Sequence, residues 1–321
     1  MQSNLETLVT VFGGSGFLGR NVVRALCRRD YRVRVAVRRP ELAGYLQPSG
    51  RVGQVHTVQA NLRYPASVEA AIRDSHIVIN LVGILAEAGG QTFDAVQAKG
   101  AETVARAAAA AGARLIHVSA IGADAGSASH YARAKAAGEQ AVLAAVPSAT
   151  IFRPSVMFGP EDQFTNRFAA LARISPVLPL IGGDTRMQPV YVGDVATAVA
   201  DAVDGKAKAG ATYELGGPEV LTMREIIEAI LEITERKRML VPLPFGLARF
   251  KAAFLQFAPG ALKLTPDQVT LLESDNVVSD AAKAAGLTLE GLGIAADSLE
   301  AIAPQYLWRF RAAGQFQRKS A

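Results

Sequence analysis

The chain has 321 residues, half of them hydrophobic and a fifth charged, which is typical of a globular protein with a substantial core. A single cysteine, Cys27, excludes a disulfide within the chain and fits a reducing compartment; with neither a signal peptide nor an apolar run of roughly 18 residues, we expect a soluble or peripherally attached protein. The formal net charge of +5 does not by itself indicate one class of partner. The sequence has no basic–aromatic stripe of the kind that binds nucleic acid, so nucleic-acid binding is not expected.

Short β-rich runs alternate with helical patterns in the first half of the chain. Strands are predicted at residues 8–12, 32–37, 55–60, 76–83, 113–120 and 149–155, and helices at 17–29, at 93–111 and from Tyr131. This alternation predicts parallel strands with helices on both faces, and the apolar run "HIVINLVG" suits a central strand. The expected fold class is α/β, with a Rossmann-like doubly wound parallel sheet.

The second half of the chain has a different pattern. Prolines cluster between residues 154 and 189, and loops separate helical patterns at 195–203, 223–234, 245–257 and 266–274. We therefore expect a dinucleotide-binding domain at residues 1–155. A smaller, mainly helical lobe is expected at 156–321, with chain crossings back to the sheet.

The loop "GGSGFLG" after the first predicted strand carries three glycines three residues apart. Gly13 permits a tight turn, Gly16 removes a side chain where a pyrophosphate must approach, and Gly19 lets the following helix lie close to the strand. The free N–H groups at the start of that helix attract phosphate. A glycine triplet in this strand–turn–helix context predicts a bound dinucleotide, whereas a bare turn would not need all three glycines.

Two arginines follow the second strand, where an NAD-binding protein usually carries a carboxylate. Arg38 and Arg39 can hold a ribose 2′-phosphate, so we expect NADPH or NADP rather than NAD, unless both arginines are merely solvated turn residues. Asn61 is placed to bond the adenine edge and Gly83 to lie near the adenosine. Asn80 before it could equally be a strand-end cap.

The motifs "GGSGFLG", "ANL" and "YARAK" together resemble the extended and atypical short-chain dehydrogenase/reductases. In that family the tyrosine exchanges a proton with the substrate oxygen, and the lysine lowers the tyrosine pKa and binds the nicotinamide ribose. The resemblance assigns these catalytic roles to Tyr131 and Lys135. Their i, i+4 spacing puts both on one face of a helix.

A narrower resemblance covers residues 7–221 through "NLVGIL", "HVSAIGAD", "FRPSVMFGPED" and "MQPVYVGDVA". These segments are similar to the NADPH-binding accessory subunits of respiratory complex I and their bacterial relatives. The resemblance implies a tightly held NADPH, docking on peripheral-arm subunits, and a place on the cytoplasmic face of a bacterial inner membrane, or otherwise in the cytoplasm. The cofactor residues that it implies are Gly13, Ser15, Gly16, Phe17, Arg38, Asn61, Val82, Ser119, Tyr131, Lys135 and Pro154.

Catalysis is in doubt because the family's substrate-binding Ser or Thr is replaced by Ile121. Losing one such donor costs roughly 10²–10³ in rate, unless Ser127 or Ser129 folds back into the site. We therefore predict a non-catalytic, stabilising subunit. The alternatives are a free NADP-dependent reductase or epimerase of a small or lipid-like substrate, and a sensor of the NADPH/NADP ratio. The four histidines are scattered, and no spacing predicts a metal site.

The segment "PLPFGLARFKAAFLQFAPG", residues 242–260, is more apolar than a solvent-facing helix. Either it is buried against its own lobe, or residues 245–257 face a membrane or a partner protein. The aromatic and basic carboxyl-terminal segment "YLWRFRAAGQFQRK" has the same two interpretations.

Overall fold

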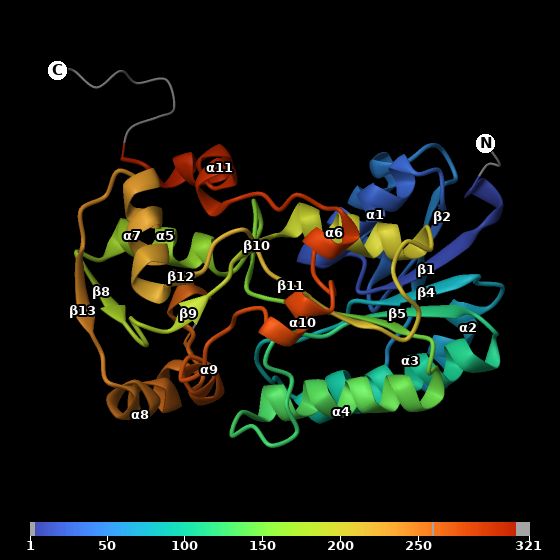
Figure 1. Ribbon diagram of the computed structural model, residues 1–321, viewed down its shortest axis with the longest axis horizontal. Coiled ribbons are helices and arrows are strands. Elements are labelled where there is room, and N and C mark those ends of the chain that lie inside the picture. The colour runs from blue at the N-terminus through green and yellow to red at the C-terminus, as the bar shows by residue number, and fades with distance from the viewer. Residues whose placement is uncertain (1–3, 259, 313–321) are drawn as a thin grey trace. The chain divides into compact units, whose positions relative to one another are not determined.

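The structure is a computed structural model that describes residues 4–258 and 260–312 (Figure 1). The chain divides into two compact units. The first comprises Met1–Pro154, Val192–Leu215 and Ser279–Ala295, and the second comprises Ser155–Tyr191, Gly216–Val278 and Ala296–Ala321. The chain thus leaves the first unit after Pro154 and returns to it twice.

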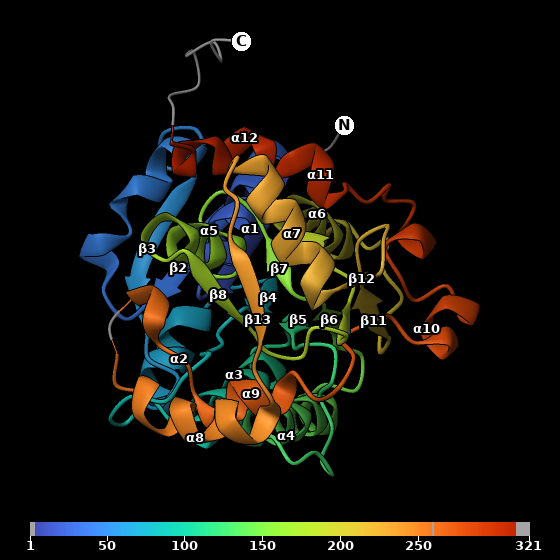
Figure 2. The ribbon, with the colours of Figure 1, turned by 90° about the vertical axis from the view of Figure 1, so that its left-hand side faces the viewer.

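A seven-stranded parallel sheet forms the centre of the first unit, in the order β11-β6-β5-β4-β1-β2-β3 (Figure 2). Its strands are β1 (Leu8–Phe12), β2 (Arg32–Val37), β3 (Val55–Gln59), β4 (Ile77–Asn80), β5 (Arg114–Val118), β6 (Thr150–Pro154) and β11 (Thr212–Leu215). All five residues of β1 are buried, as a central strand covered on both faces requires. The predicted Rossmann-like sheet is confirmed.

Helices cover both faces of this sheet (Figure 1). The helices of the first unit are α1 (Phe17–Arg28), α2 (Pro65–Ile72), α3 (Lys99–Ala110), α4 (His130–Ala145), α6 (Val192–Val203) and α10 (Asp280–Ala284). Helices α1 and α6 pack together on one face, and α2, α3 and α4 lie on the other. The alanine run of α3 allows a close approach, because Ala105 and Ala108 are fully buried among side chains such as Val78 and Leu115.

The helix predicted over residues 93–111 is present, but its first turn is not a regular α turn. Residues Asp94–Ala98 form a π-helical turn, and the regular helix α3 begins only at Lys99. Helix α4 packs tightly on this turn: a Cβ on Gly138 would lie 2.3 Å from the carbonyl oxygen of Gln97. The sequence pattern of apolar residues does not distinguish a π turn from an α turn, so this feature was not predictable from it.

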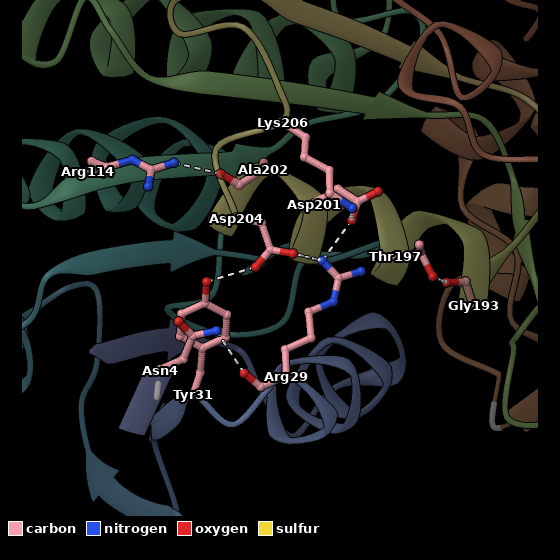
Figure 3. Close-up of polar contacts among 10 residues, drawn as sticks. All are labelled: Asn4, Arg29, Tyr31, Arg114, Gly193, Thr197, Asp201, Ala202, Asp204 and Lys206. Carbon is pink, nitrogen blue, oxygen red and sulfur yellow. Dashed lines mark hydrogen bonds and ion pairs between the residues drawn. The ribbon is translucent and has the colours of Figure 1, made fainter. Parts of the chain in front are cut away.

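A polar network joins helix α6, with which the chain returns to the first unit, to the rest of that unit (Figure 3). The Arg29 guanidinium lies 2.7 Å from a carboxylate oxygen of Asp201 and 2.5 Å from one of Asp204. The Tyr31 hydroxyl donates a hydrogen bond to Asp204 at 2.8 Å. Arg114 donates to the carbonyl oxygen of Ala202 at 2.6 Å, near the end of α6, where that oxygen also accepts from the Gly205 N–H.

The second unit combines helices with short strands. Its helices are α5 (Thr165–Ile174), α7 (Met223–Ile233), α8 (Phe245–Leu255), α9 (Pro266–Leu271), α11 (Leu299–Ile302) and α12 (Pro304–Leu307). Its strands are β7 (Met157–Phe158), β8 (Val177–Leu180), β9 (Arg186–Met187), β10 (Val190–Tyr191), β12 (Leu221–Thr222) and β13 (Met239–Pro242). Most of its core lies around α5 and α7, with Phe158, Ile226 and Ile230 fully buried.

Two predicted helices of this unit are shorter than expected, because α8 ends at Leu255 and α9 at Leu271. A capping box between Thr265 and Gln268 fixes the start of α9. Across residues 4–258 and 260–312, no helix combines the length and the apolar character needed to cross a membrane.

Candidate dinucleotide-binding site

The glycine loop joins β1 to α1 at the carboxyl edge of the sheet. Gly13 has a φ of +76°, which side chains rarely allow, and its N–H donates to Ala36 on the neighbouring strand. The Gly16 N–H then donates to the Gly13 carbonyl at 2.9 Å and closes the turn. A Cβ on Gly19 would lie 2.2 Å from the same carbonyl oxygen, so only glycine permits helix and loop to approach so closely.

The start of α1 is suited to bind an anion. Its N-cap is Gly16, which has no side chain to occupy the free N–H groups of the first turn. A Cβ on Gly16 would meet only the Gly13 oxygen, at 3.2 Å, so this glycine is not required by packing as Gly19 is. A pyrophosphate approaching these N–H groups accounts for the missing side chain.

Tyr45, which the sequence did not single out, covers the same loop. Its hydroxyl donates to the Ser15 carbonyl oxygen at 2.6 Å, and the Arg20 guanidinium lies 5.3 Å from its ring centre. The tyrosine therefore holds the loop in place and brings a cation beside it. Nothing in the sequence marks this residue, because 33 positions and three elements separate it from β1.

Arg38 and Arg39 stand exposed after β2, which is paired with β1 in parallel, so their backbone lies at the same edge as the glycine loop. Neither guanidinium has a polar partner within the described ranges, which leaves both available to a phosphate. Asn61 follows β3 at this edge, where its side-chain oxygen accepts from the Arg63 N–H at 3.2 Å. Its side-chain N–H groups remain the ones suited to an adenine edge.

The segment after β4 completes the loop edge. The buried Asn80 accepts a hydrogen bond from the Val82 N–H at 3.2 Å, so it is a strand-end cap. A Cβ on Gly83 would lie 3.4 Å from the Lys135 ammonium and 3.6 Å from the Gln97 side-chain oxygen. Gly83 therefore marks the place where two polar side chains from two helices meet.

Helix α4 supplies the Tyr131–Lys135 pair. The two residues share a helix face, with the ammonium 6.0 Å from the tyrosine ring centre, and the ring packs edge-on against Phe93 at 5.7 Å. Lys135 is 5% exposed and donates to the Val118 carbonyl oxygen at 3.2 Å. Burial lowers the pKa of Lys135 from 10.5 to about 8, and the nearby Glu139 carboxylate opposes that shift only in part.

Three buried side chains carry polar atoms without hydrogen-bond partners at this end of the site. Within the described part of the chain, no hydrogen bond reaches the Ser119 hydroxyl, either polar atom of the Gln97 amide, or Nε2 of His117. An unsatisfied buried polar group costs roughly 1–3 kcal/mol, so natural folds keep them where a ligand or water completes them. These groups fit a polar molecule bound beyond the ends of β4 and β5.

Gln97 is the functional candidate that sequence reasoning missed. It sits in the π turn Asp94–Ala98 and is 2% exposed, and its side-chain oxygen lies beside Gly83, as the Lys135 ammonium does. Single π turns often occur at functional sites. The only available signal was a glutamine inside an alanine-rich helical pattern.

The structure gives no hydroxyl to the position of Ile121. Its backbone N–H donates to the Pro154 carbonyl oxygen at 3.0 Å, which ties the segment after β5 to the end of β6. The Ser129 hydroxyl accepts from the Ala132 N–H and caps α4, and the Ser127 hydroxyl accepts from the Ser129 N–H. Both serines thus shape the start of α4.

The remaining predicted features have structural explanations. The Asp162 carboxylate accepts from the backbone N–H groups of Phe164 and Asn166 at the start of α5. His130 lies 3.2 Å from the Asp94 carboxylate on the surface. Within the described ranges, no group of three side chains has the arrangement of a metal site.

The fold and the loop define a Rossmann-type protein of the short-chain dehydrogenase/reductase class. The family of the RmlD substrate binding domain matches residues 7–252. The mitochondrial NADH dehydrogenase (ubiquinone) 1 alpha subcomplex subunit 9 of Arabidopsis thaliana is 37% identical over 96% of this chain and 79% of its own length. The chain belongs to the family of these complex I subunits, within the RmlD-type class, which confirms the resemblance seen in the sequence.

Two further proteins are similar. A ceramide reductase of Caulobacter vibrioides is 38% identical over 61% of this chain and 61% of its own length. The NADPH-dependent quinone oxidoreductase QOR2 of Escherichia coli, solved with NADPH, shares the fold with a TM-score of 0.72 at 20% identity, covering 94% of this chain and 99% of that one.

Proposed function

We propose that this protein is an NADP(H)-binding accessory subunit that stabilises a bacterial respiratory NADH:quinone oxidoreductase. The observation that carries the proposal is the 37% identity over nearly the whole chain to a complex I subunit of the same family. The expected partners are subunits of the peripheral arm, and the expected place is the cytoplasmic face of the inner membrane.

The dinucleotide is expected along the carboxyl edge of the sheet. The glycine loop and the start of α1 bind the pyrophosphate, and Arg38 and Arg39 hold the 2′-phosphate that distinguishes NADPH from NADH. The residues proposed to contact it are Gly13, Ser15, Gly16, Phe17, Gly19, Arg38, Arg39, Asn61, Val82, Gly83, Ser119, Tyr131, Lys135 and Pro154. The unpartnered Ser119 hydroxyl supports the nicotinamide end of this assignment.

A stabilising role fits the chemistry around Tyr131. When bound, NADPH supplies a hydride donor. Lys135, held by the Val118 carbonyl oxygen, binds the ribose hydroxyls, which give the buried ammonium further hydrogen-bond acceptors. Ile121 gives no hydroxyl to orient a reacting carbonyl, so binding is retained while turnover is weak.

The cofactor assignment is tested by mass spectrometry of the nucleotide retained after gentle purification. We expect NADPH or NADP at close to one per chain. In titrations of the stripped protein, Arg38→Asp is expected to weaken NADPH binding at least tenfold more than NADH binding, since the lost contact is to the 2′-phosphate. The matched control is Arg32→Asp, exposed at the other end of β2. Equal losses for both nucleotides would refute the 2′-phosphate assignment.

The partner assignment is tested by affinity isolation of a tagged chain from bacterial membranes solubilised in mild detergent. Co-purification of NADH:quinone oxidoreductase subunits is expected, together with reduced assembly of that enzyme when the gene is deleted. An intact enzyme in the deletion strain and no co-purified subunit would contradict the proposal.

A second candidate function is an NADP-dependent reductase of a lipid-like carbonyl compound. Two observations favour it: the Tyr131–Lys135 pair is intact, and the Gln97 amide is unpartnered beside it. The similarity to a ceramide reductase points to a long-chain substrate. Tyr131 would then give its proton to the carbonyl oxygen, and Lys135 would stabilise the resulting phenolate.

Purified protein separates the two candidates. NADPH oxidation that depends on a long-chain ketone, and that Tyr131→Phe abolishes while nucleotide binding persists, would establish the reductase. No turnover above the Tyr131→Phe control across such ketones would support the accessory role.

A further inference from the structure

Helix α8 presents two unlike faces. Ala248 and Ala252 are fully buried and pack with Val269 in a small cluster. Leu247, Phe250 and Phe254 recur at helical spacing on the face turned away from those alanines, since successive residues rotate by about 100°. The side chains of Leu247, Phe250, Phe254 and Phe257, which we call the apolar row, therefore point outward.

The apolar row is exposed. Phe250 is 65% exposed, Phe254 67% and Phe257, just beyond the helix, 82%. The two helix phenylalanines pack edge-on against each other at 5.4 Å, which leaves their outer faces uncovered. The alternative that residues 245–257 are buried against their own lobe is wrong for these side chains. Adjacent exposed aromatic residues of this size are rare on a surface that faces only water.

Only cations accompany the apolar row. From Arg236 to Pro266 the chain contains six basic residues and no acidic one. Arg249 is ion-paired with Glu273 at 3.2 Å, but Lys251 and Lys263 have no polar partner within residues 4–258 and 260–312. The charge next to the apolar row is therefore positive and not neutralised.

We propose that α8 binds the surface of an anionic lipid bilayer, with the apolar row inserted among the acyl chains and Lys251 and Lys263 on the phosphate groups. A helix that lies in the membrane interface has this composition: aromatic residues on one face, lysines at its margins, and no net acidic charge. Side chains of Lys reach upward along the helix and keep their ammonium groups at the headgroup level.

A lipid surface explains the pattern better than a protein partner does. A protein interface of ordinary size places a polar rim of both signs around its apolar centre. Here the margin carries unpaired lysines. Of the acidic residues in the following segment, Glu273 is paired with Arg249 and Asp275 with Arg186, and Asp267 lies in the first turn of α9. The phosphate groups of an anionic bilayer can pair with both lysines at once, and such binding requires no shaped groove in the protein. This proposal does not depend on the bound nucleotide or on complex I, because it needs only lipid.

The test is co-sedimentation of the purified full-length protein with vesicles that contain no other protein. Vesicles of 30 mol% phosphatidylglycerol in phosphatidylcholine are compared with pure phosphatidylcholine. We expect at least about tenfold stronger binding to the anionic vesicles, weakened by raised salt. Phe250→Ser/Phe254→Ser is expected to lower binding at least about tenfold.

Charge and apolar contributions are separated by Lys251→Glu/Lys263→Glu, which we expect to lose the preference for anionic vesicles. Ile174→Ser is the matched control, because Ile174 is 71% exposed in the same unit but lies at the end of α5. In a Trp308→Phe background, a tryptophan placed by Phe254→Trp reports insertion through a blue shift of its emission. This readout shows that the variant protein is folded and bound to the vesicles.

Wild-type protein that ignores anionic vesicles, or serine variants that bind them as wild type does, would overturn the proposal. Retention on native membranes that protease treatment of those membranes abolishes, without vesicle binding, would also overturn it and indicate a protein partner instead. Nucleotide retention, measured on the same samples, is expected to stay unchanged in every α8 variant, so failure here is distinguishable from failure of the cofactor assignment.

Discussion

Removing the charge of Lys135 should stabilise the nucleotide-free protein. The side chain is 5% exposed, and burial lowers its pKa from 10.5 to about 8. A depression of this size corresponds to about 3 kcal/mol of unfavourable burial of the charged form. Methionine has a similar shape, so Lys135→Met removes this cost and loses mainly the hydrogen bond to Val118, about 1 kcal/mol. At pH 7 we expect a net gain of about 2 kcal/mol.

The pH dependence makes the prediction specific. The folded-state pKa lies below the unfolded one, so between pH 8 and 10.5 the unfolded state of the wild type binds more protons. The stability of the wild type therefore rises through this range, by about 1.4 kcal/mol per pH unit at most, while the methionine variant gains nothing from this group. The advantage of the variant should shrink and vanish by about pH 10.

The assay is urea unfolding of stripped protein at pH 7, 8, 9 and 10, with nucleotide removed because a bound ligand would mask the difference. The control is Lys99→Met at the exposed start of α3, which should change the free energy of unfolding by less than about 0.5 kcal/mol. A Lys135→Met variant that is less stable than wild type at pH 7, or whose difference does not change with pH, would refute the reasoning. The variant should also retain less nucleotide.

Three further outcomes are expected. Gly19→Ala should lower the free energy of unfolding of the first unit by about 3 kcal/mol or more, because its Cβ would meet a backbone oxygen at 2.2 Å. Gly16→Ala should keep the free energy of unfolding within about 1 kcal/mol of wild type yet bind nucleotide at least tenfold less tightly. Calorimetry checks the stability of both variants, and titration checks nucleotide binding. Burial and the Lys135 charge lower the pKa of His117 to about 3, so stability should fall as pH drops from 6.5 towards 4, and His117→Gln should flatten that slope in urea unfolding. Arg29→Met should lower the free energy of unfolding by about 2 kcal/mol, because Asp204 loses its cationic partner. The exposed Arg51→Met should change it by almost nothing, and equal effects of the two substitutions would contradict the network in Figure 3.

Six of the seven strands of the sheet were predictable from the sequence because each is a short β-rich run between turn residues, whereas the edge strand β11 was not predicted. The run containing β4 reads as buried on both sides, and all four residues of β4 are buried. The glycine loop was predictable for a related reason: a sharp strand–turn–helix transition constrains residue type locally. Helix ends were less predictable, since α8 and α9 end two and three residues before the apolar pattern does.

What the sequence did not reveal depends on contacts between distant segments. Tyr45 acts on Ser15 from a separate element, and Gln97 comes to Lys135 only because α4 packs against the π turn. The network around Arg29 likewise joins α1 to a helix more than 160 residues later in the chain. Local periodicity carries no information about such pairs, so a pattern analysis finds the loop that holds a phosphate but not the groups that shape the rest of the site.

The unpartnered polar groups at the ends of β4 and β5 indicate what this site is built to hold. A fold that only needed stability would place apolar residues at Ser119 and Gln97 and would not bury the ammonium of Lys135 with its pKa depressed to about 8. The chain keeps all three, beside an Ile121 that contributes no hydroxyl. This combination is expected of a site whose ligand is bound for its structural effect, because a resident NADPH would supply hydrogen-bond partners for the buried polar groups, the Lys135 ammonium included. Efficient hydride transfer would further require a donor for the substrate oxygen. The nucleotide would then add to the stability of the first unit through linkage, and its removal should lower the unfolding temperature of the wild type more than that of Lys135→Met.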